Sequence, residues 1–182
     1  MTEGKGYCIA RPGAAPLDVH LIKVGGTTAY FRTDFLCNNE VVILRNSVNG
    51  KYLSVYKGWW LWWTPNPPSS SSSRAHFVIA GLEEGERLTV GRVFKLRHNK
   101  WASYEVGITD SVNSEYGGRM LGLYQTCNRK RMFQSRRSKT WLSPLQLKFQ
   151  APRGEEGIGG GRDGGGLPPQ MPLDDGSMVV VL

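Results

Sequence analysis

The segment from Arg129 to Lys139 holds the densest group of side chains that could bind a charged ligand. Six of its residues are basic, one is aromatic and none is acidic; the basic ones are Arg129, Lys130, Arg131, Arg136, Arg137 and Lys139. Positive charge at this density attracts phosphates, lipid headgroups or acidic protein surfaces. A solvent-exposed basic loop with no dedicated partner is the plainer interpretation, and the sequence leaves both open. Two basic clusters so spaced also resemble a bipartite nuclear-import signal.

A second candidate site is the tryptophan run at residues 58–64, which places four of the six tryptophans within five positions. Neighbouring side chains of a strand point to opposite faces. One face would therefore carry Trp59, Leu61 and Trp63, and the other Trp60 and Trp62. We expect the first set to fill a core. Trp60 and Trp62 either pack under the loop at residues 65–73 or form an aromatic platform for a sugar ring, a base or a membrane interface.

Signals for catalysis are weak. The three histidines, His20, His76 and His98, have no His or Cys at metal-ligand spacing. Glycine-rich phosphate loops and nucleophile-elbow motifs are missing from the sequence. The glutamates at 83, 84 and 86 lie beside a glycine and read as a solvated turn. We therefore predict no enzymatic activity, no metal site and no cofactor.

The charge balance bears on the partner. The chain has a net charge of +8, and its first 150 residues carry 21 Lys and Arg against 10 Asp and Glu. This favours an acidic protein surface such as a cytoskeletal filament, or else an anionic membrane or nucleic acid. No apolar run is long enough to span a bilayer and no secretory signal is recognisable. Three isolated cysteines favour reduced thiols. We expect a cytoplasmic protein, or a nuclear one if the basic clusters act in import.

The elements that would position these residues are almost all short strands. Residues 40–45 and 51–56 flank Asn49-Gly50, which is a strong hairpin signal. Further strands are expected at 76–79, 87–90 and 93–97, whereas no stretch has a sustained helical period. This pattern predicts an all-β domain at residues 1–150. The Gly- and Pro-rich residues 151–182 are expected to form a disordered tail. Its terminal valines would be a frayed end, with a short docking strand as the alternative.

A weak internal repeat accompanies these strands. Residues 49–56 can be aligned with 117–124, and residues 42–46 with 93–98. Each repeat would close on an apolar strand, at 77–79 in the first and at 145–149 in the second. The order of these matches along the chain predicts a repeated strand unit.

The segments 42–45, 50–53, 58–61 and 77–79 together resemble the repeat of fascin-like, actin-crosslinking-like β-trefoil domains. The resemblance implies a β-trefoil-like barrel of short antiparallel strands that binds without catalysis. Actin-filament bundling is typical of that family, and glycan or protein binding of related trefoils. Three units are expected and two are recognisable, so residues 1–35 would either supply a degenerate unit or pair as an edge. We therefore predict a module for an acidic protein surface such as actin filaments, with an anionic-membrane module or a nucleic-acid binder as alternatives.

Overall fold

The computed structural model describes residues 2–4, 6–10, 19–24, 36–56, 59–69, 73–126, 133–135, 138–140, 142–149 and 177–179. Strands joined by turns make up this part of the chain, and it contains no α-helix. No membrane-spanning helix was found among these residues. The prediction of an all-β domain is confirmed for them.

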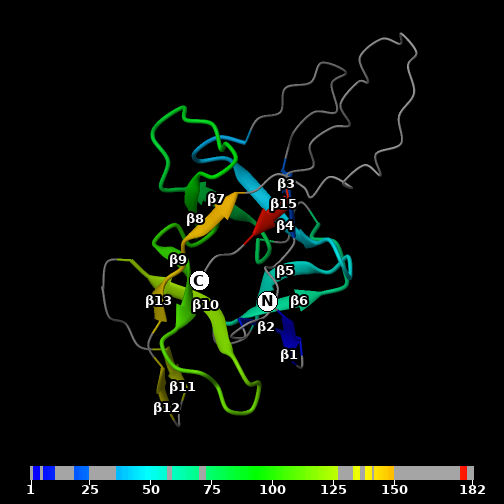
Figure 1. Ribbon diagram of the computed structural model, residues 1–182, viewed down its shortest axis with the longest axis vertical. Coiled ribbons are helices and arrows are strands. Elements are labelled where there is room, and N and C mark those ends of the chain that lie inside the picture. Colours follow the sequence, from blue (N-terminus) through cyan, green and yellow to red (C-terminus); the bar gives the residue numbers. More distant parts are fainter. Residues whose placement is uncertain are drawn as a thin grey trace, which may run out of the picture.

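Eight of the strands close into an antiparallel barrel (Figure 1). Each strand of this ring pairs with the next and the last pairs with the first; in ring order they are β4 (Val41–Asn46), β5 (Tyr52–Val55), β6 (Leu61–Thr64), β2 (Tyr7–Ala10), β10 (Arg119–Gln125), β9 (Tyr104–Thr109), β8 (Val93–His98) and β7 (Phe77–Ala80). Closure of the ring pairs the strand edges that an open sheet would leave exposed.

A second closed circuit shares three of these strands. It adds β3 (Val19–Lys23), β14 (Leu147–Phe149) and β15 (Ser177–Val179), and it runs β4, β7, β8, β14, β15, β3 and back to β4. Two further strands extend the sheet, since β1 (Thr2–Gly4) pairs with β2 and β13 (Leu142–Pro144) with β9. The prediction of a frayed end is wrong at Ser177–Val179, which pair on both sides as the docking-strand alternative requires. The other residues of the predicted disordered tail, 151–176 and 180–182, lie outside the described residues.

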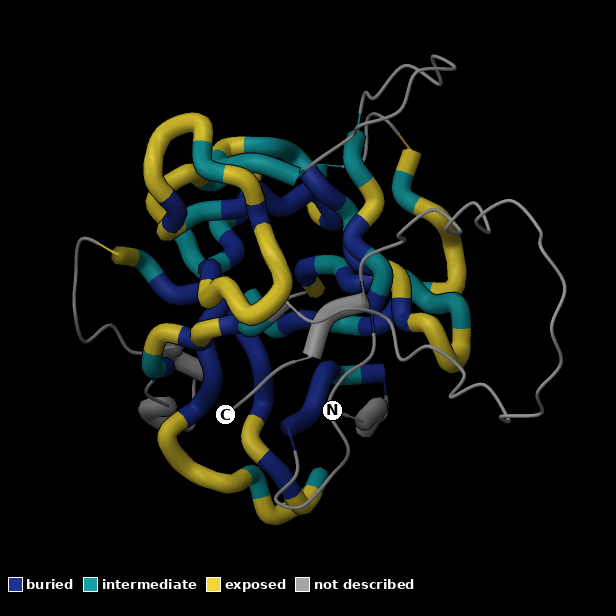
Figure 2. Tube along the Cα trace, turned by 45° about the horizontal axis from the view of Figure 1, so that its top comes forward, coloured by how far each residue is buried: buried dark blue, intermediate teal, exposed yellow. Residues whose placement is uncertain are grey.

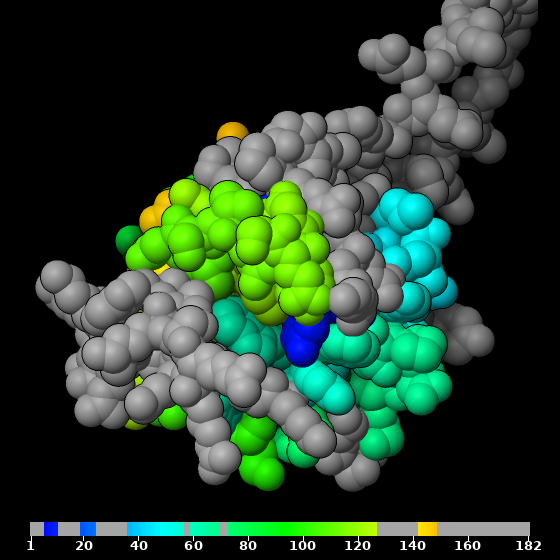
Figure 3. Space-filling view, turned by 90° about the horizontal axis from the view of Figure 1, so that it is seen from below, coloured from blue at the N-terminus to red at the C-terminus, as the bar shows by residue number. Residues whose placement is uncertain are grey.

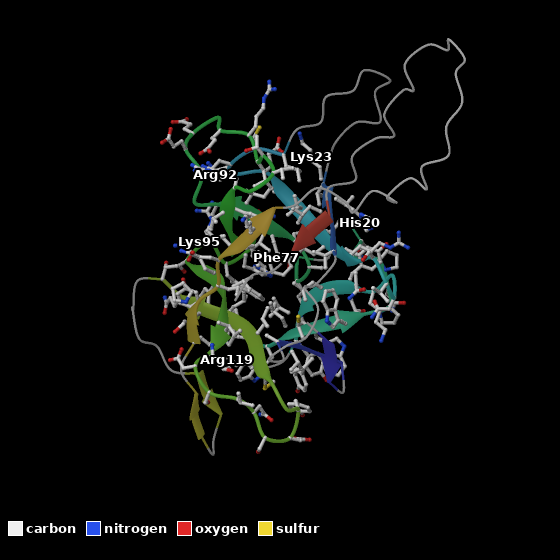
Figure 4. All side chains as sticks on the ribbon, in the orientation of Figure 1. His20, Lys23, Phe77, Arg92, Lys95 and Arg119 are labelled. Atoms are coloured by element: carbon white, nitrogen blue, oxygen red, sulfur yellow. The ribbon has the colours of Figure 1, made fainter. Side chains whose placement is uncertain are left out.

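The core lies inside the barrel and follows from alternation along the strands (Figure 2). Buried and half-buried positions alternate along β5 and β6, so that every second side chain points inward. The largest fully buried side chains include Trp63, Phe77 and Phe94, and Phe77 lies near the middle of the molecule in Figure 4. Burying one side chain of this size stabilises the fold by about 2–3 kcal/mol.

The predicted hairpin at Asn49-Gly50 is confirmed, but its turn is organised by Asn46. The Asn46 N–H donates to the Lys51 carbonyl (2.8 Å), and the Gly50 N–H donates to the Asn46 carbonyl (2.9 Å). The Asn46 Oδ1 atom accepts the N–H groups of Val48 and Asn49 at 2.9 and 3.1 Å. The side chain thus satisfies two backbone donors inside the loop, which is how asparagine stabilises tight turns.

The hairpin between β9 and β10 has the same turn, built on Asn113. The Asn113 N–H donates to the Gly118 carbonyl (2.8 Å), and the Gly117 N–H donates to the Asn113 carbonyl (2.9 Å). The Asn113 Oδ1 atom accepts the N–H groups of Glu115 and Tyr116 at 2.9 and 3.2 Å. The glycine of each turn is left-handed, with φ of 69° at Gly50 and 63° at Gly117. Glycine is therefore required at the fourth position after each asparagine.

The strand pairing corrects part of the predicted repeat. The match of 42–46 with 93–98 agrees with the strand pairing. Val42 of β4 faces Phe77 of β7. In the same way, Phe94 of β8 faces Leu147 of β14. The match of 49–56 with 117–124 is wrong. It aligns β5 with β10, whereas β9 is the strand that follows β8 as β5 follows β4. Both segments follow the same Asn-x-x-x-Gly turn, at Asn46–Gly50 before β5 and at Asn113–Gly117 before β10, which explains why they look alike.

Candidate functional site

The inward half of the tryptophan run packs as predicted, except at its first residue. Leu61 and Trp63 are buried in the barrel core. Trp59 precedes β6, and its backbone is left-handed (φ 69°). Its side chain therefore does not follow the in-and-out alternation of the strand. Its ring stacks on Tyr104 with centroids 4.6 Å apart and meets the edge of Trp101 at 4.6 Å. Trp59 therefore covers one side of the core without entering it.

Trp60 is half-buried against the neighbouring strand. It forms an isolated bridge with Gly122 of β10, and its carbonyl accepts the Tyr56 N–H at 2.8 Å. A Cβ atom on Gly122 would lie 3.1 Å from Cε3 of Trp60, so the indole rests directly on the β10 backbone. Part of the ring is therefore unavailable to a ligand.

Trp62 is half-buried in a different setting, against the backbone of Gly6. A Cβ atom on Gly6 would lie 2.0–2.4 Å from three atoms of the indole, and Gly6 has a left-handed φ of 91°. Glycine is required here both for the backbone conformation and for the space that the ring occupies. The indole stacks on Tyr56 with centroids 4.8 Å apart and an interplanar angle of 27°.

Trp62 belongs to a group of four aromatic residues that we call the Tyr–Trp cluster: Tyr7, Tyr56, Trp62 and Tyr116. Tyr7 lies at the centre, with its ring centroid 4.9 Å from Trp62, 5.6 Å from Tyr116 and 6.5 Å from Tyr56. Tyr56 is 42% exposed and the other three are half-buried. Figure 3 shows this face, where residues 6–10 lie among segments from the middle and later parts of the chain.

The three tyrosines of the cluster were not predicted as site residues. They come from β2, from the end of β5 and from the loop between β9 and β10, which are far apart in the sequence. Strand closure alone brings them together, and no local motif marks them. Edge-to-face and stacked rings at 4.5–7 Å attract one another beyond the area that they bury. The result is a fixed aromatic surface whose most accessible member is Tyr56.

Two described parts of the basic segment and its flank, residues 133–135 and 138–140, form a two-stranded ribbon where a loop was expected. β11 (Phe133–Ser135) and β12 (Ser138–Thr140) pair only with each other among the described strands, and Lys139 faces Gln134. Ser135 faces Ser138, so the two residues that join the strands are Arg136 and Arg137. These two, together with Arg129, Lys130 and Arg131, lie outside the described residues. In Figure 1 the ribbon lies at the same end of the molecule as the loop that carries Tyr116.

The fully buried side chains of His98 and Cys8 are held in neutral forms. His98 is fully buried, stacks on Trp101 at 4.3 Å, and accepts the Trp101 N–H at Nδ1 (3.2 Å). Burial lowers the pKa of His98 to about 4, so the ring is uncharged at neutral pH. Burial also raises the pKa of the Cys8 thiol to about 12, which keeps it protonated. Both groups therefore act as packed core residues.

Two acidic side chains, those of Glu86 and Glu105, are engaged in contacts within the fold. The Glu86 carboxylate accepts the Glu83 N–H at 2.7 Å and pairs with Arg92 at 2.7 Å, and these contacts lower its pKa. Glu105 accepts the Tyr124 hydroxyl at 2.7 Å. Within the described part of the chain, no three His, Cys, Asp or Glu residues are grouped so that they could hold a metal ion.

Compared with known proteins, the chain matches no family model, no curated protein and no solved structure. Its function therefore has to be inferred from the Tyr–Trp cluster, the basic ribbon and the barrel that positions them.

Proposed function

We propose that the chain is a fascin-like β-trefoil domain and a non-catalytic binding module for an acidic protein surface such as an actin filament. A trefoil has three units, each with two barrel strands and one hairpin. The six-strand circuit supports this proposal, since it consists of three strand pairs: β4 with β7, β8 with β14, and β15 with β3. Each pair has a matching hairpin, formed by β5–β6, β9–β10 and β1–β2 respectively.

The registers of the first two units support the same proposal. Arg45 of β4 faces Tyr52, and the corresponding Arg97 of β8 faces Glu105. In the hairpins, the buried pair Leu53–Trp63 corresponds to the buried pair Val106–Leu123. The third unit would combine the first strands of the chain with the last one, which explains why the sequence reveals only two units.

The observation that carries the functional proposal is the ribbon of β11 and β12, which pair only with each other among the described strands. Its connecting residues are Arg136 and Arg137, and Lys139 lies on its second strand. In Figure 1 the loop that carries Tyr116 of the Tyr–Trp cluster lies at the same end of the molecule as the ribbon. Arginine, tyrosine and tryptophan are enriched in the energetically dominant parts of protein–protein interfaces. Positive charge would steer an acidic filament toward the ribbon, and the cluster would supply apolar contact area.

The setting of the two indoles favours a protein partner over the membrane alternative. Insertion at a bilayer interface requires indoles that can leave the protein surface. Trp60 rests on Gly122 and Trp62 rests on Gly6, so both rings are held against backbone. A nucleic-acid partner would need a free ring face for base stacking, and in the cluster Tyr56 is exposed whereas the other three rings are half-buried.

The test is co-sedimentation of the full chain with actin filaments and, in parallel, with anionic liposomes, each at low and high salt. We expect binding to filaments that weakens as salt rises, and little binding to liposomes. The variant Arg136→Gln/Arg137→Gln should lose most of the filament binding. A matched control is Arg92→Gln/Lys95→Gln, which removes two charges from β8 and the turn before it (Figure 4). Equal loss in both variants, or binding to liposomes alone, would contradict the proposal.

A further inference from the structure

The C-terminal strand occupies a slot between two strands from distant parts of the chain. Met178 of β15 faces Val19 of β3, and Ser177 faces His20. On its other side, Val179 faces Lys148 of β14 and Met178 faces Phe149. Val19 is fully buried, so the slot borders the core. Figure 1 shows β15 between β3 and β14, where it closes the six-strand circuit.

The connection that leads into β15 is much longer than this geometry requires. Phe149 and Met178 face each other in neighbouring antiparallel strands, yet residues 150–176, which number 27, separate β14 from β15. Antiparallel neighbours are ordinarily joined by about 2–5 residues. A connection of this length can reach at most roughly 90 Å when fully extended, against about 5 Å between paired strands. The length of the connection therefore does not confine β15 to its own barrel.

The strand is also held by few backbone pairs. Two residue pairs join it to each neighbour, compared with five between β3 and β4. When β15 leaves the slot, the edges of β3 and β14 expose unpaired N–H and C=O groups. Such edges accept another strand of suitable sequence. The segment with the matching sequence and register is β15 of another copy.

We propose that two copies of the chain exchange their C-terminal strands, with β15 of each inserted between β3 and β14 of the other. The exchanged dimer repeats the pairs seen within one chain, so it needs no new interface, and it is two-fold symmetric. The connection makes insertion of β15 into its own barrel an intramolecular event, whereas exchange between two chains is bimolecular. The closed monomer therefore predominates in dilute solution and the exchanged form grows with protein concentration. This consequence rests on the proposed function: the exchanged dimer would carry two filament-binding sites, one from each chain.

The test uses a disulfide between facing residues of two full-length chains. Facing residues in antiparallel strands have Cα atoms about 4.5–5.5 Å apart, which a disulfide can bridge. One chain carries Lys148→Cys and the other Val179→Cys, and the two are mixed at low and high concentration under mild oxidation. We expect a cross-linked heterodimer whose yield rises with concentration. The control mixture pairs Lys148→Cys with Val112→Cys, which is 53% exposed on another loop and accounts for cross-links through the native cysteines.

Two results would overturn the exchange. The first is a heterodimer yield no higher than in the control mixture, while a single chain with both Lys148→Cys and Val179→Cys closes its disulfide internally. In that case β15 pairs only within its own chain. The second is that neither the mixture nor the doubly substituted chain forms the bond, which would show that β15 does not occupy the slot. Because no filament is present, the outcome is independent of whether the chain binds actin.

Discussion

Replacing Gly6 by alanine should destabilise the protein strongly, because Gly6 is where the backbone meets Trp62. Two costs add. A non-glycine residue in the left-handed region costs about 1–2 kcal/mol, and Gly6 has φ 91°. The added methyl group would lie 2.0 Å from Cζ2 of Trp62, which no real contact permits. Overpacking of this kind adds about 1–3 kcal/mol. We therefore expect a loss of about 2–5 kcal/mol in the free energy of unfolding.

The matched control is Gly85→Ala. Gly85 is also left-handed (φ 73°), but no atom lies within 4 Å of the position where its Cβ would be. The free energy of unfolding of this variant should fall only by the cost of a non-glycine residue in the left-handed region, about 1–2 kcal/mol. The difference between the two variants isolates the contact with the indole. Chemical denaturation followed by circular dichroism measures both.

A double-mutant cycle makes the test sharper. In a Trp62→Leu background the smaller side chain leaves room for the methyl group, so Gly6→Ala should then cost no more than Gly85→Ala. The coupling energy should be about 1–3 kcal/mol, as is typical of residues in contact. If Gly6→Ala costs the same as Gly85→Ala, or if its cost does not change in the Trp62→Leu background, the reasoning about the Tyr–Trp cluster is refuted.

Three further predictions concern the turn, the buried histidine and a buried hydroxyl. Asn46→Ala should lower the free energy of unfolding by about 1–2 kcal/mol, because it leaves two loop N–H groups without the acceptor that the side chain provides; the exposed Asn49→Ala should cost less, and equal costs in denaturation curves would contradict the assignment. His98 is neutral when folded and protonated when unfolded between pH 6.5 and about 4, so stability should fall as pH decreases through this window, by at most about 3 kcal/mol. Between pH 6.5 and 5, His98→Gln should flatten the dependence of the unfolding free energy on pH. An unchanged pH dependence would refute the assignment of this effect to His98. Tyr124→Phe removes the hydrogen bond to Glu105 and should cost about 1–2 kcal/mol, whereas a cost near zero would mean that this bond contributes nothing to stability.

Much of the strand content was predictable because it depends on local patterns. The prediction of a strand at 87–90 was wrong, since only an isolated bridge between Arg87 and Cys37 forms there. Alternating burial in β5 and β6 and the Asn-Gly hairpin signal are both properties of short segments. The burial of Leu61 and Trp63 followed from alternation alone. Trp59 departed from that pattern because its backbone is left-handed, a conformation that is unusual for a tryptophan and that no propensity predicts.

The candidate site was less predictable because it depends on closure of the barrel. Tyr7 meets Tyr116 only when β2 joins β10, and Trp62 meets Gly6 only when β2 joins β6. These pairings span more than 50 residues of sequence. The role of β15 was misjudged for the same reason, since its partners β3 and β14 lie far from it in the chain and a terminal valine run has no local signal for docking. The ribbon was missed because its strands are only three residues long.

The central claim, that the basic ribbon binds an acidic filament, is tested most directly by the affinity of the full chain for actin filaments as a function of salt. Charge-driven binding weakens steeply as salt rises, by an amount that grows with the number of charges engaged. The account predicts a steep salt dependence for the unmodified chain and a shallower one, with weaker binding, for Arg136→Gln/Arg137→Gln. An affinity for actin filaments that changes neither with salt nor on these two substitutions would contradict it.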